Sequence, residues 1–286
     1  MQSAQFELHA KIEESHWWFT ARRQIMQALV EQVLPPDGKS TIVDVGCGTG
    51  GNIATLVDGY KCVGIDTSAD AIQFARQKFP NVRFLQGAAP EDLGETAKEA
   101  RLYLLMDVLE HVEDDFALLS NLFMAAAPGA YFLITVPADM ALWSPHDVAF
   151  GHYRRYDKPR FERVWRDLPA RALAVSYYNS RLYPVVRAIR TKNRLLRKSQ
   201  GDAGTDFAIP SPRVNKALER LFAGESNRLV KLLRGKKKRG YRRGVSLVAL
   251  LQREAGEAAQ LHKPADIKPD YFDPQAAREE ELVGAS

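Results

Sequence analysis

Apolar residues along this chain follow two different spacings. Between residues 25 and 34 they recur every three or four positions, as on one face of a helix, and Pro35-Pro36-Asp37-Gly38 ends the run. Beyond it, short β-branched runs alternate with helical segments, which is typical of a parallel sheet flanked by helices. Strands are predicted at residues 41–45, 62–65, 82–85, 102–106, 131–136 and 173–177, with helices at 52–57, 69–78 and 114–126.

The chain changes character after Tyr178. Two basic amphipathic helices are predicted, through residues 182–189 and 214–230, with a loop at 201–212 between them and a last strand at 244–251. The tail has few large apolar residues and is expected to be disordered. We therefore expect four parts: an N-terminal helical lid at 1–39, an α/β core at 40–180 and 244–254, a basic helical insertion at 181–243 that forms a second lid, and the tail at 255–286.

Composition narrows the class of protein. With 286 residues, 45% of them hydrophobic, the chain can bury one substantial core. Its start is polar, and its longest apolar stretch, residues 125–136, is broken by Pro128 and Gly129, so we expect neither a secretory signal nor a membrane span and predict a cytoplasmic protein. The two cysteines, Cys47 and Cys62, have no Cys or His at metal-ligand spacing, so no disulfide and no metal site is expected.

The loop after the first predicted strand carries Gly46, Gly48 and Gly50 and leads directly into a helical segment. Glycines let the backbone turn tightly and approach a ligand, and the following helix N-terminus favours a nucleotide-like cofactor. With Gly51 the loop also fits the dinucleotide pattern Gly-x-Gly-x-x-Gly, but Asp44 would repel a pyrophosphate. The ammonium and sulfonium of S-adenosylmethionine would instead be attracted by that carboxylate, which favours this cofactor over a nicotinamide dinucleotide.

Four motifs in succession resemble those of class I S-adenosylmethionine-dependent methyltransferases. They are Asp44-x-Gly46-x-Gly48-x-Gly50, Gly64-Ile65-Asp66, Met106-Asp107-Val108-Leu109-Glu110-His111-Val112 and Ala127-Pro128-Gly129. The resemblance implies a doubly wound α/β fold with a seven-stranded, mostly parallel sheet whose last strand, residues 244–251, is antiparallel. It also implies S-adenosylmethionine as the cofactor.

The same resemblance assigns cofactor contacts. The glycine loop would hold the methionine part, Asp66 would bind the ribose diol, and Asp107 and Val108 would lie beside the cofactor. Many relatives carry an acid after the third strand to bind adenine, whereas this chain has Gln86-Gly87-Ala88-Ala89, so backbone groups are expected to read the adenine. The expected cofactor-binding residues are Asp44, Gly46, Cys47, Gly48, Gly50, Asn52, Asp66, Thr67, Ala88, Ala89, Asp107 and Val108.

Candidate acceptor residues fall in three places. Trp17, Trp18 and Arg22 could form an aromatic and cationic lid, or could equally pack the first helix onto the sheet. His111 follows the fourth strand, where the methyl group would lie, and could act as a base, orient the acceptor or serve only as a cap. The third place is the connection after the fifth strand, in which the expected residues are Trp143, His146, His152, Tyr153, Arg154, Arg155 and Tyr156.

That connection, with its Gly-His-Tyr-Arg-Arg-Tyr stretch at 151–156, resembles a bacterial subgroup of class I methyltransferases that also has the aromatic N-terminal helix. Arg154 and Arg155 suit an anionic group, although they could instead pair with acids at the surface. The expected catalytic residues are His111, His146, His152 and Tyr156, and the expected acceptor-binding residues are Trp17, Trp18, Arg22, Trp143, Tyr153, Arg154 and Arg155.

The functional prediction is O- or N-methylation of a small metabolite or of a glycan- or lipid-linked acceptor carrying an anionic group. The basic stretch at 181–243 could alternatively lie on anionic lipid, or bind RNA in an RNA methyltransferase. RNA is less favoured because Tyr241 is the only stacking aromatic in the basic cluster at 236–243. A protein that binds S-adenosylmethionine without catalysis is a further alternative, and a nicotinamide-dependent dehydrogenase is the least favoured.

Overall fold

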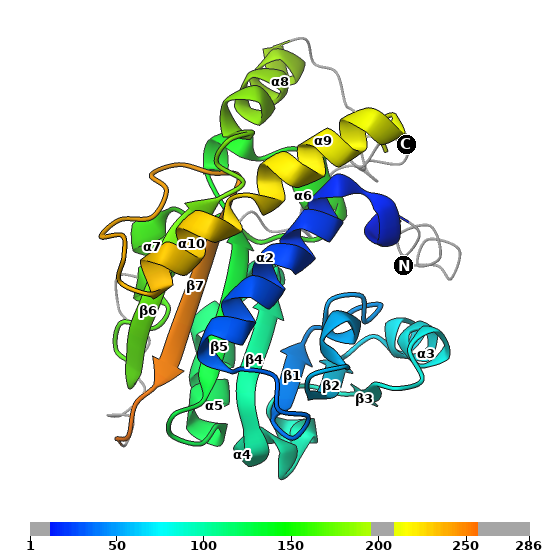
Figure 1. Ribbon diagram of the computed structural model, residues 1–286, viewed down its shortest axis with the longest axis vertical. Coiled ribbons are helices and arrows are strands. Elements are labelled where there is room, and N and C mark those ends of the chain that lie inside the picture. The colour runs from blue at the N-terminus through cyan, green and yellow to red at the C-terminus, as the bar shows by residue number, and fades with distance from the viewer. Residues whose placement is uncertain (1–11, 196–208, 257–286) are drawn as a thin grey trace, which may run out of the picture.

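A computed structural model describes residues 12–195 and 209–256. Its centre is one sheet of seven strands in the order β3-β2-β1-β4-β5-β7-β6 (Figure 1). Neighbouring strands from β3 to β5 are parallel, and β7 runs antiparallel to both β5 and β6. The strands are β1 (Thr41–Val45), β2 (Lys61–Asp66), β3 (Arg83–Gln86), β4 (Ala100–Met106), β5 (Tyr131–Pro137), β6 (Ala170–Tyr178) and β7 (Ser246–Arg253). The predicted fold and the antiparallel last strand are confirmed.

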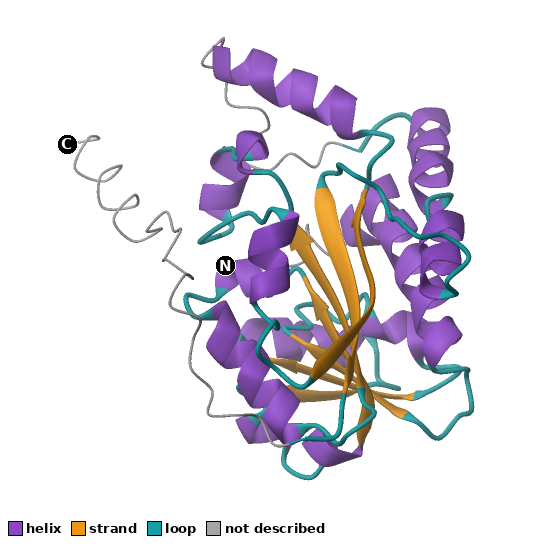
Figure 2. Ribbon diagram, turned by 90° about the vertical axis from the view of Figure 1, so that its left-hand side faces the viewer, coloured by secondary structure: helices purple, strands orange, loops and turns teal. Residues whose placement is uncertain are grey.

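Helices cover both faces of this sheet (Figure 2). The α-helices are α2 (Trp17–Val33), α3 (Ala69–Lys78), α4 (Thr96–Glu99), α5 (Asp115–Ala125), α6 (Pro145–Ala149), α7 (Lys158–Arg163), α8 (Tyr183–Leu195), α9 (Pro212–Ala223) and α10 (Ser226–Leu233). Single turns of 3₁₀ helix lie at η1 (Ile53–Leu56), η2 (Glu91–Leu93), η3 (Leu109–His111) and η4 (Met140–Leu142). The helix expected at 52–57 is therefore only the short turn η1, and the expected disordered tail lies outside the described residues from position 257 onward.

The helix predicted through residues 214–230 is two helices, α9 and α10, which meet at Gly224 and Glu225. The reason is tertiary: Glu225 turns inward and accepts hydrogen bonds from the backbone amides of Ser180 and Arg181, each at 2.9 Å. Both helices pack beside α2, as Figure 1 shows. No helix in the two described stretches of chain is long and apolar enough to cross a membrane.

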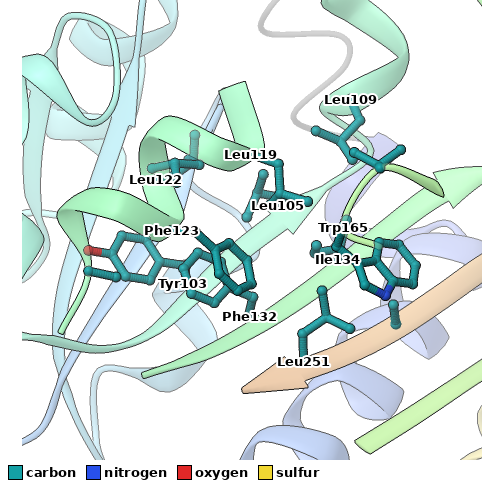
Figure 3. Close-up of a cluster of buried hydrophobic side chains, with 14 of the residues drawn as sticks. Tyr103, Leu105, Leu109, Leu119, Leu122, Phe123, Phe132, Ile134, Trp165 and Leu251 are labelled. Carbon is teal, nitrogen blue, oxygen red and sulfur yellow. The ribbon is translucent and has the colours of Figure 1, made fainter. Parts of the chain in front are cut away.

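Alternating side chains divide the core into two clusters, one on each face of the sheet. On β4, Tyr103 and Leu105 belong to the cluster beneath α5, whereas Leu102 and Leu104 belong to the cluster beneath α2. In the first cluster, the ring of Phe132 stacks on those of Tyr103 and Phe123 at centroid distances of 4.8 and 4.1 Å (Figure 3). Both faces of the central strands are buried, so these strands are mostly apolar, as parallel strands usually are, with Asp44 of β1 and Thr135 of β5 as buried polar exceptions.

The topology brings several chemically active segments to one edge of the sheet. Strands β1, β2, β4 and β5 are parallel, so the residues that follow each of them emerge on the same side. The order of the strands reverses between β1 and β4, and in open α/β sheets ligands bind at such a switch point. The site is therefore expected above the ends of β1 and β4.

Candidate functional site

Two adjoining cavities lie at this edge. The first, about 600 Å³ in volume, is the glycine-loop cleft, and it is lined by residues that follow β1, β2, β3 and β4. The second, about 410 Å³, is the histidine cavity, and it lies between the start of α2, the end of β4, the connection after β5 and α8. The residues that line both are Glu13, Gly46, Gly48, Asp107, His111 and Phe150. A ligand in the cleft can thus meet a ligand in the cavity.

The glycine loop is shaped by close packing as well as by its ligand-facing backbone. Gly46 has a φ of +66°, and a Cβ on it would lie 2.9 Å from Val108 Cγ2, so the chain passes too close to β4 for any side chain. Gly50 has a φ of +81°, and its Cβ would lie 2.6 Å from the ring of Phe84. Gly50 lines neither cavity and packs against β3, so its expected contact with the cofactor stays a prediction.

Asp66 ends β2 and lines the cleft next to Thr67, as expected. Its Oδ2 accepts a hydrogen bond from the amide of Gly48 and its Oδ1 one from the amide of Ser68, both at 2.9 Å. Each carboxylate oxygen has a second lone pair. Asp66 therefore fixes the glycine loop and can still accept from a ligand hydroxyl.

Ala88 and Ala89 line the cleft, where they were predicted to read the adenine. The amide of Ala88 donates to Asp92 Oδ2 at 2.8 Å, and its carbonyl accepts from the amide of Asp92 at 2.9 Å. The amide is thus engaged within the chain, whereas the carbonyl has a second lone pair. Adenine reading by these backbone groups stays a prediction, and Asp92 is the acid that orders the turn.

Asp44 does not line either cavity, and its expected contact with the cofactor stays a prediction. Its side chain lies within β1 and is 1% exposed, and apart from a weak contact with the backbone amide of Ile53 its carboxylate has no hydrogen-bond partner among the described residues. Desolvation raises the pKa of Asp44 to about 8, against the opposing effect of the Arg22 guanidinium. A buried carboxylate without a strong partner is costly, and a cation bound close to the glycine loop would relieve that cost.

Asp107 lies at the boundary of the two cavities and follows β4 directly. Its φ of +61° is unusual for a residue with a side chain and costs about 1–3 kcal/mol, which indicates that its surroundings hold it in place. The Asp107 carboxylate pairs with Arg22 and accepts from Thr135 Oγ1 at 3.0 Å. The Arg22 guanidinium lies 4.4 Å from the centroid of the Trp18 ring, so the first turn of α2 is tied to the end of β4.

The histidine cavity contains seven of the expected acceptor and catalytic residues. They are Trp17, Trp18, Arg22, His111, His146, His152 and Arg155. Cys47 and Asn52, expected at the cofactor, line this cavity too, next to the glycine loop. Helix α2 thus brings both tryptophans to the lining of this cavity, and the lid predicted from the aromatic pair stays a prediction.

A buried acid organises one wall of the cavity. Asp147 is fully buried, and its Oδ1 lies 2.9 Å from His152 Nδ1 and 2.8 Å from Arg155 Nε. Desolvation acts to raise the pKa of Asp147, but the hydrogen bond and charge of His152, together with Arg155, outweigh it and hold the pKa well below its usual value. His152 is thus fixed through Nδ1, which leaves Nε2 toward the cavity.

Two further histidines of the cavity, His111 and His146, are neutral near pH 7. Desolvation lowers the pKa of His111 to about 4, helped by His152, whose ring centroid lies 4.6 Å away in an edge-on arrangement. Desolvation also lowers the pKa of His146 to about 3. Neutral imidazoles can accept a proton or coordinate a cation. Glu110, between Asp107 and His111, is fully buried, and desolvation raises its pKa well above the usual value.

Four of the expected acceptor and catalytic residues lie outside both cavities. Arg154 is 2% exposed and donates to the carbonyls of Val112 and Glu113, each at 2.7 Å, so it holds the chain after β4 and cannot reach an acceptor. Tyr156 is fully buried, and its hydroxyl donates to Asp115 Oδ2 at 2.8 Å. The expected catalytic role of Tyr156 and the acceptor role of Arg154 are corrected to structural ones, and Trp143 and Tyr153 line neither cavity.

Sequence reasoning missed several cavity residues. Val186, Ile189 and Arg190 come from α8, and Glu13 precedes α2 and accepts from Thr49 Oγ1 at 2.5 Å. The amphipathic pattern after Tyr178 predicted the helix but not which of its residues face a ligand. The missed residues of the histidine cavity are Glu13, His16, Phe19, Met106, Glu110, Pro137, Phe150, Asn179, Val186, Ile189, Arg190, Val245 and Ser246.

Known proteins resemble this chain in both sequence and fold. The profile of a family described as a methyltransferase domain matches residues 18–177, more than half of the chain. The chain therefore belongs to the methyltransferase domain family. At the level of this family, the expected cofactor, S-adenosylmethionine, and methyl transfer as the class of reaction are confirmed.

Among curated relatives, a trans-aconitate 2-methyltransferase of Azoarcus sp. (strain BH72) is 29% identical over 189 residues, 60% of this chain and 66% of that protein. One from Paracidovorax citrulli is 27% identical over 166 residues, 54% of this chain and 61% of that protein. The chain thus spans less than two thirds of the length of either relative. The plantazolicin methyltransferase BamL, solved in complex with a triazolic desmethylPZN analog and SAH, has a TM-score of 0.52 at 13% identity, covering 88% of this chain and 91% of that chain, which shows the shared fold.

Proposed function

We propose that this protein methylates a small acceptor that carries an anionic group, most simply a carboxylate. The observation that carries the proposal is the histidine cavity, which opens onto the glycine-loop cleft at Asp107 and His111 and presents Arg155 and Arg190 beside two tryptophans. A guanidinium recognises a carboxylate well, and tryptophan faces suit an apolar or unsaturated carbon frame. The relatives named trans-aconitate 2-methyltransferase support an acceptor of this chemical class.

The cleft fits S-adenosylmethionine. Asp66 and Thr67 would hold the ribose, Gly46 and Gly48 would lie along the methionine part, and Glu13 offers a carboxylate at the boundary of the cavities. The buried carboxylate of Asp44 supports a cationic group nearby, as an ammonium would provide. When bound, S-adenosylmethionine supplies a methyl group activated by the positive sulfur.

The residues of the cavity would mainly orient the acceptor. Methyl transfer is a displacement at carbon: the new bond to the acceptor forms while the carbon–sulfur bond breaks, and the bonding pair leaves with sulfur. A carboxylate oxygen is already ionised near pH 7, so no proton moves and positioning does most of the work. A hydroxyl or amine acceptor must lose a proton. The histidines His111, His146 and His152 line the cavity and could accept that proton.

The direct test is turnover of a panel of acceptors. Purified protein is incubated with S-adenosylmethionine and di- or tricarboxylic acids, their amides and their esters, and S-adenosylhomocysteine and the methylated product are measured by mass spectrometry. We expect methyl esters from acids with an unsaturated or branched frame and none from the matching amides. Equal turnover of acids and amides, or none with any acid, would contradict the proposal.

Arg190 provides a sharper test, with a control on the same helix. Arg190 lines the cavity and its side chain is 14% exposed, whereas Arg187, one turn earlier, is 49% exposed and contacts Tyr183. We expect Arg190→Gln to raise the KM of the carboxylic acceptor by roughly tenfold, as loss of one charge-assisted hydrogen bond would. Arg187→Gln should change that KM less than about twofold, and neither should alter cofactor affinity.

Helix α8 also supports a second candidate, an acceptor linked to a lipid or glycan. Val185 and Ile189 are 56% and 43% exposed, and Ile189 lines the cavity as well, so an apolar tail could leave along this helix. The acceptor-lid role proposed for residues 181–243 accordingly falls to α8, because α9 and α10 pack against α2. Turnover of a lipid-linked acid but not of its short-chain analogue would favour this candidate.

The RNA alternative is tested by binding. A basic surface that tracks phosphates loses affinity steeply with salt, so binding of RNA that survives physiological ionic strength would favour an RNA acceptor. A non-catalytic role is tested by calorimetric titration with S-adenosylmethionine and by the acceptor panel together. Binding without turnover of any acceptor would favour that role.

A further inference from the structure

We propose that Glu110, His111 and His152 form a binding site for one divalent transition-metal ion on the wall of the histidine cavity. One potential ligand atom from each of the three lies within 4.8 Å of the others. Around a tetrahedral ion with bonds of about 2.1 Å, ligand atoms lie roughly 3.4 Å apart. The ligand atoms must therefore move closer together on binding, and His111, the one exposed member of the group, is the residue whose ring can move most freely.

The carboxylate member of the group has no partner on another residue. Glu110 is fully buried and, its own backbone amide aside, no donor among the residues that the structure describes reaches either of its carboxylate oxygens. Leaving a carboxylate buried and unpaired costs several kcal/mol, which is why such groups are paired or coordinate metals. Glu110 lines the histidine cavity, so a cation entering from the cavity can reach it.

One ring nitrogen of His152 contacts a buried carboxylate, as is usual for histidines that bind a metal through the other ring nitrogen. Its Nδ1 lies 2.9 Å from the buried carboxylate of Asp147, which fixes the tautomer and leaves Nε2 available. The carboxylate of Asp147 is held in turn by Arg155, at 2.8 Å. This chain of contacts, from carboxylate to imidazole to cavity, orients a metal ligand before any ion arrives.

The local charge tolerates a cation although three guanidinium groups line the cavity. Arg22 is paired with Asp107, and Arg155 with Asp147, while Arg190 lies 3.8 Å from the second carboxylate oxygen of Asp147. Glu110 is a further acid that pairs with none of these arginines. Two imidazoles and one carboxylate form the ligand set of many Zn²⁺ sites and of open Fe²⁺ sites, and they favour such ions over Mg²⁺ or Ca²⁺.

The site deepens the proposed function by giving these residues one shared role. His111 lines both cavities, so an ion on this triad would lie between the cofactor and the acceptor. An open coordination position there would bind the acceptor's carboxylate or hydroxyl oxygen and aim it at the methyl group. His111 and His152 then act as ligands, and a hydroxyl acceptor would lose its proton more readily on the ion.

Metal binding by the full chain tests the proposal without any acceptor. Protein stripped with a chelator is dialysed against Zn²⁺, Mn²⁺ or Co²⁺, and the bound ion is counted by elemental analysis and titrated by calorimetry. We expect one ion per chain, with a Kd on the order of 10 μM or tighter for Zn²⁺. Bound Co²⁺ should show the visible absorption of a site with mixed nitrogen and oxygen ligands.

Variants locate the ion. Glu110→Gln and His152→Ala should each weaken Zn²⁺ binding by more than about 100-fold, because loss of a ligand costs more than the roughly 10–100-fold loss on removing a residue that only supports a ligand. His146→Ala is the matched control, a histidine of the same cavity outside the triad, and should retain the ion. Unchanged thermal unfolding and S-adenosylmethionine affinity would show that the metal-free variants are folded.

The proposal is overturned if the wild-type chain binds none of the three ions with a Kd below about 1 mM, or if Glu110→Gln and His152→Ala bind as it does. Loss of the ion in His146→Ala would also overturn the three-residue site. Because the titration contains neither cofactor nor acceptor, it stands apart from the turnover assays. If the protein binds the ion but esterifies no acid, the metal site is supported and the proposed class of acceptor is contradicted.

Discussion

The glycine-loop cleft and the histidine cavity share a boundary, but the chain builds them in different ways. The cleft is formed by residues that directly follow four parallel strands, so the sheet itself sets their positions. The cavity combines the start of α2, the connection after β5 and α8, which are far apart in the sequence. The cleft is therefore a property of the sheet, and the cavity depends on how helices and loops pack above it.

This difference predicts how each region responds to change. Substitutions in the cleft should affect folding and cofactor affinity together, because the same backbone packs against β3 and β4. Substitutions at the cavity should alter acceptor kinetics while stability and cofactor affinity stay nearly unchanged. Each of the following predictions would separate the two regions further or show that they are not separate.

The largest expected effect is on stability, at Gly50. Gly50→Ala adds a Cβ 2.6 Å from the Phe84 ring at a φ of +81°, and should lower the free energy of unfolding by roughly 2–5 kcal/mol through strain and overpacking. Gly48→Ala is the matched control, since its φ is +53° but nothing lies within 4 Å, and about 1 kcal/mol of strain is expected. Denaturant unfolding measures both. Equal losses would mean that close packing against β3 does not shape the cleft.

The next effect is on cofactor affinity, at Asp66. Asp66→Ala removes the acceptor of the Gly48 and Ser68 amides and should weaken S-adenosylmethionine binding by roughly 10- to 100-fold, equivalent to about 1.5–3 kcal/mol. Calorimetric titration gives the affinity. Asp70→Ala, an exposed acid in the first turn of α3, should bind the cofactor like wild type. A similar loss in both variants would point to helix α3 rather than to the ribose contact.

A third effect depends on pH and concerns Asp44. Its folded pKa of about 8 lies above the ordinary value of 3.8, so protonated Asp44 stabilises the fold. This contribution is full below pH 4 and is lost as the pH rises through 8. The Tm of wild type should therefore fall relative to that of Asp44→Asn over this range.

Cofactor binding gives the same prediction a second measurement. If a cationic part of S-adenosylmethionine lies near Asp44, binding at pH 7 should release up to about one proton, seen by calorimetry in buffers of different ionisation enthalpy. Asp44→Asn should release less. Equal proton release by the two proteins would separate Asp44 from the cofactor and leave it a role in the core alone.

The smallest effect concerns the docking of α8. The Tyr183 hydroxyl donates to Asp139 Oδ2 at 2.5 Å, and Tyr183→Phe should raise the acceptor KM a few fold, as loss of a hydrogen bond worth about 0.5–1.5 kcal/mol would. Cofactor affinity should not change. Tyr131→Phe, at the opposite end of β5, is the control. A parallel loss of cofactor affinity in Tyr183→Phe would show that the two regions are coupled.

Much of the fold could be predicted from local pattern. The strand at Thr41–Val45 and the helix at Ala69–Lys78 were predicted with the bounds that the structure has, because their apolar spacing and turn residues lie within the segment itself. The break between α9 and α10 could not be predicted, since it depends on Glu225 reaching the backbone of residues 180 and 181. The residues around the break do not indicate that Glu225 contacts a segment more than 40 positions away.

The two arginines at 154 and 155 show the same limit within the site. Their side chains are adjacent in the sequence, and both suit an anion, yet Arg155 lines the cavity whereas Arg154 binds backbone carbonyls after β4. In an extended segment, successive side chains point to opposite sides, and only the surroundings decide which side faces a ligand. From the sequence, both arginines could be proposed as anion ligands, but it could not be predicted which of the two lines the cavity.

By itself, the sequence determined the sheet, the glycine loop and the acids near the carboxyl ends of β1, β2 and β4. These features rest on short-range spacing and on the rule that parallel strands end at one edge. Only the tertiary structure decided that Asp44 is buried, that α8 contributes Arg190 to the cavity, and that His152 meets Glu110 and His111. The physical reason is that desolvation and side-chain contact depend on distances between segments, which spacing along the chain does not fix.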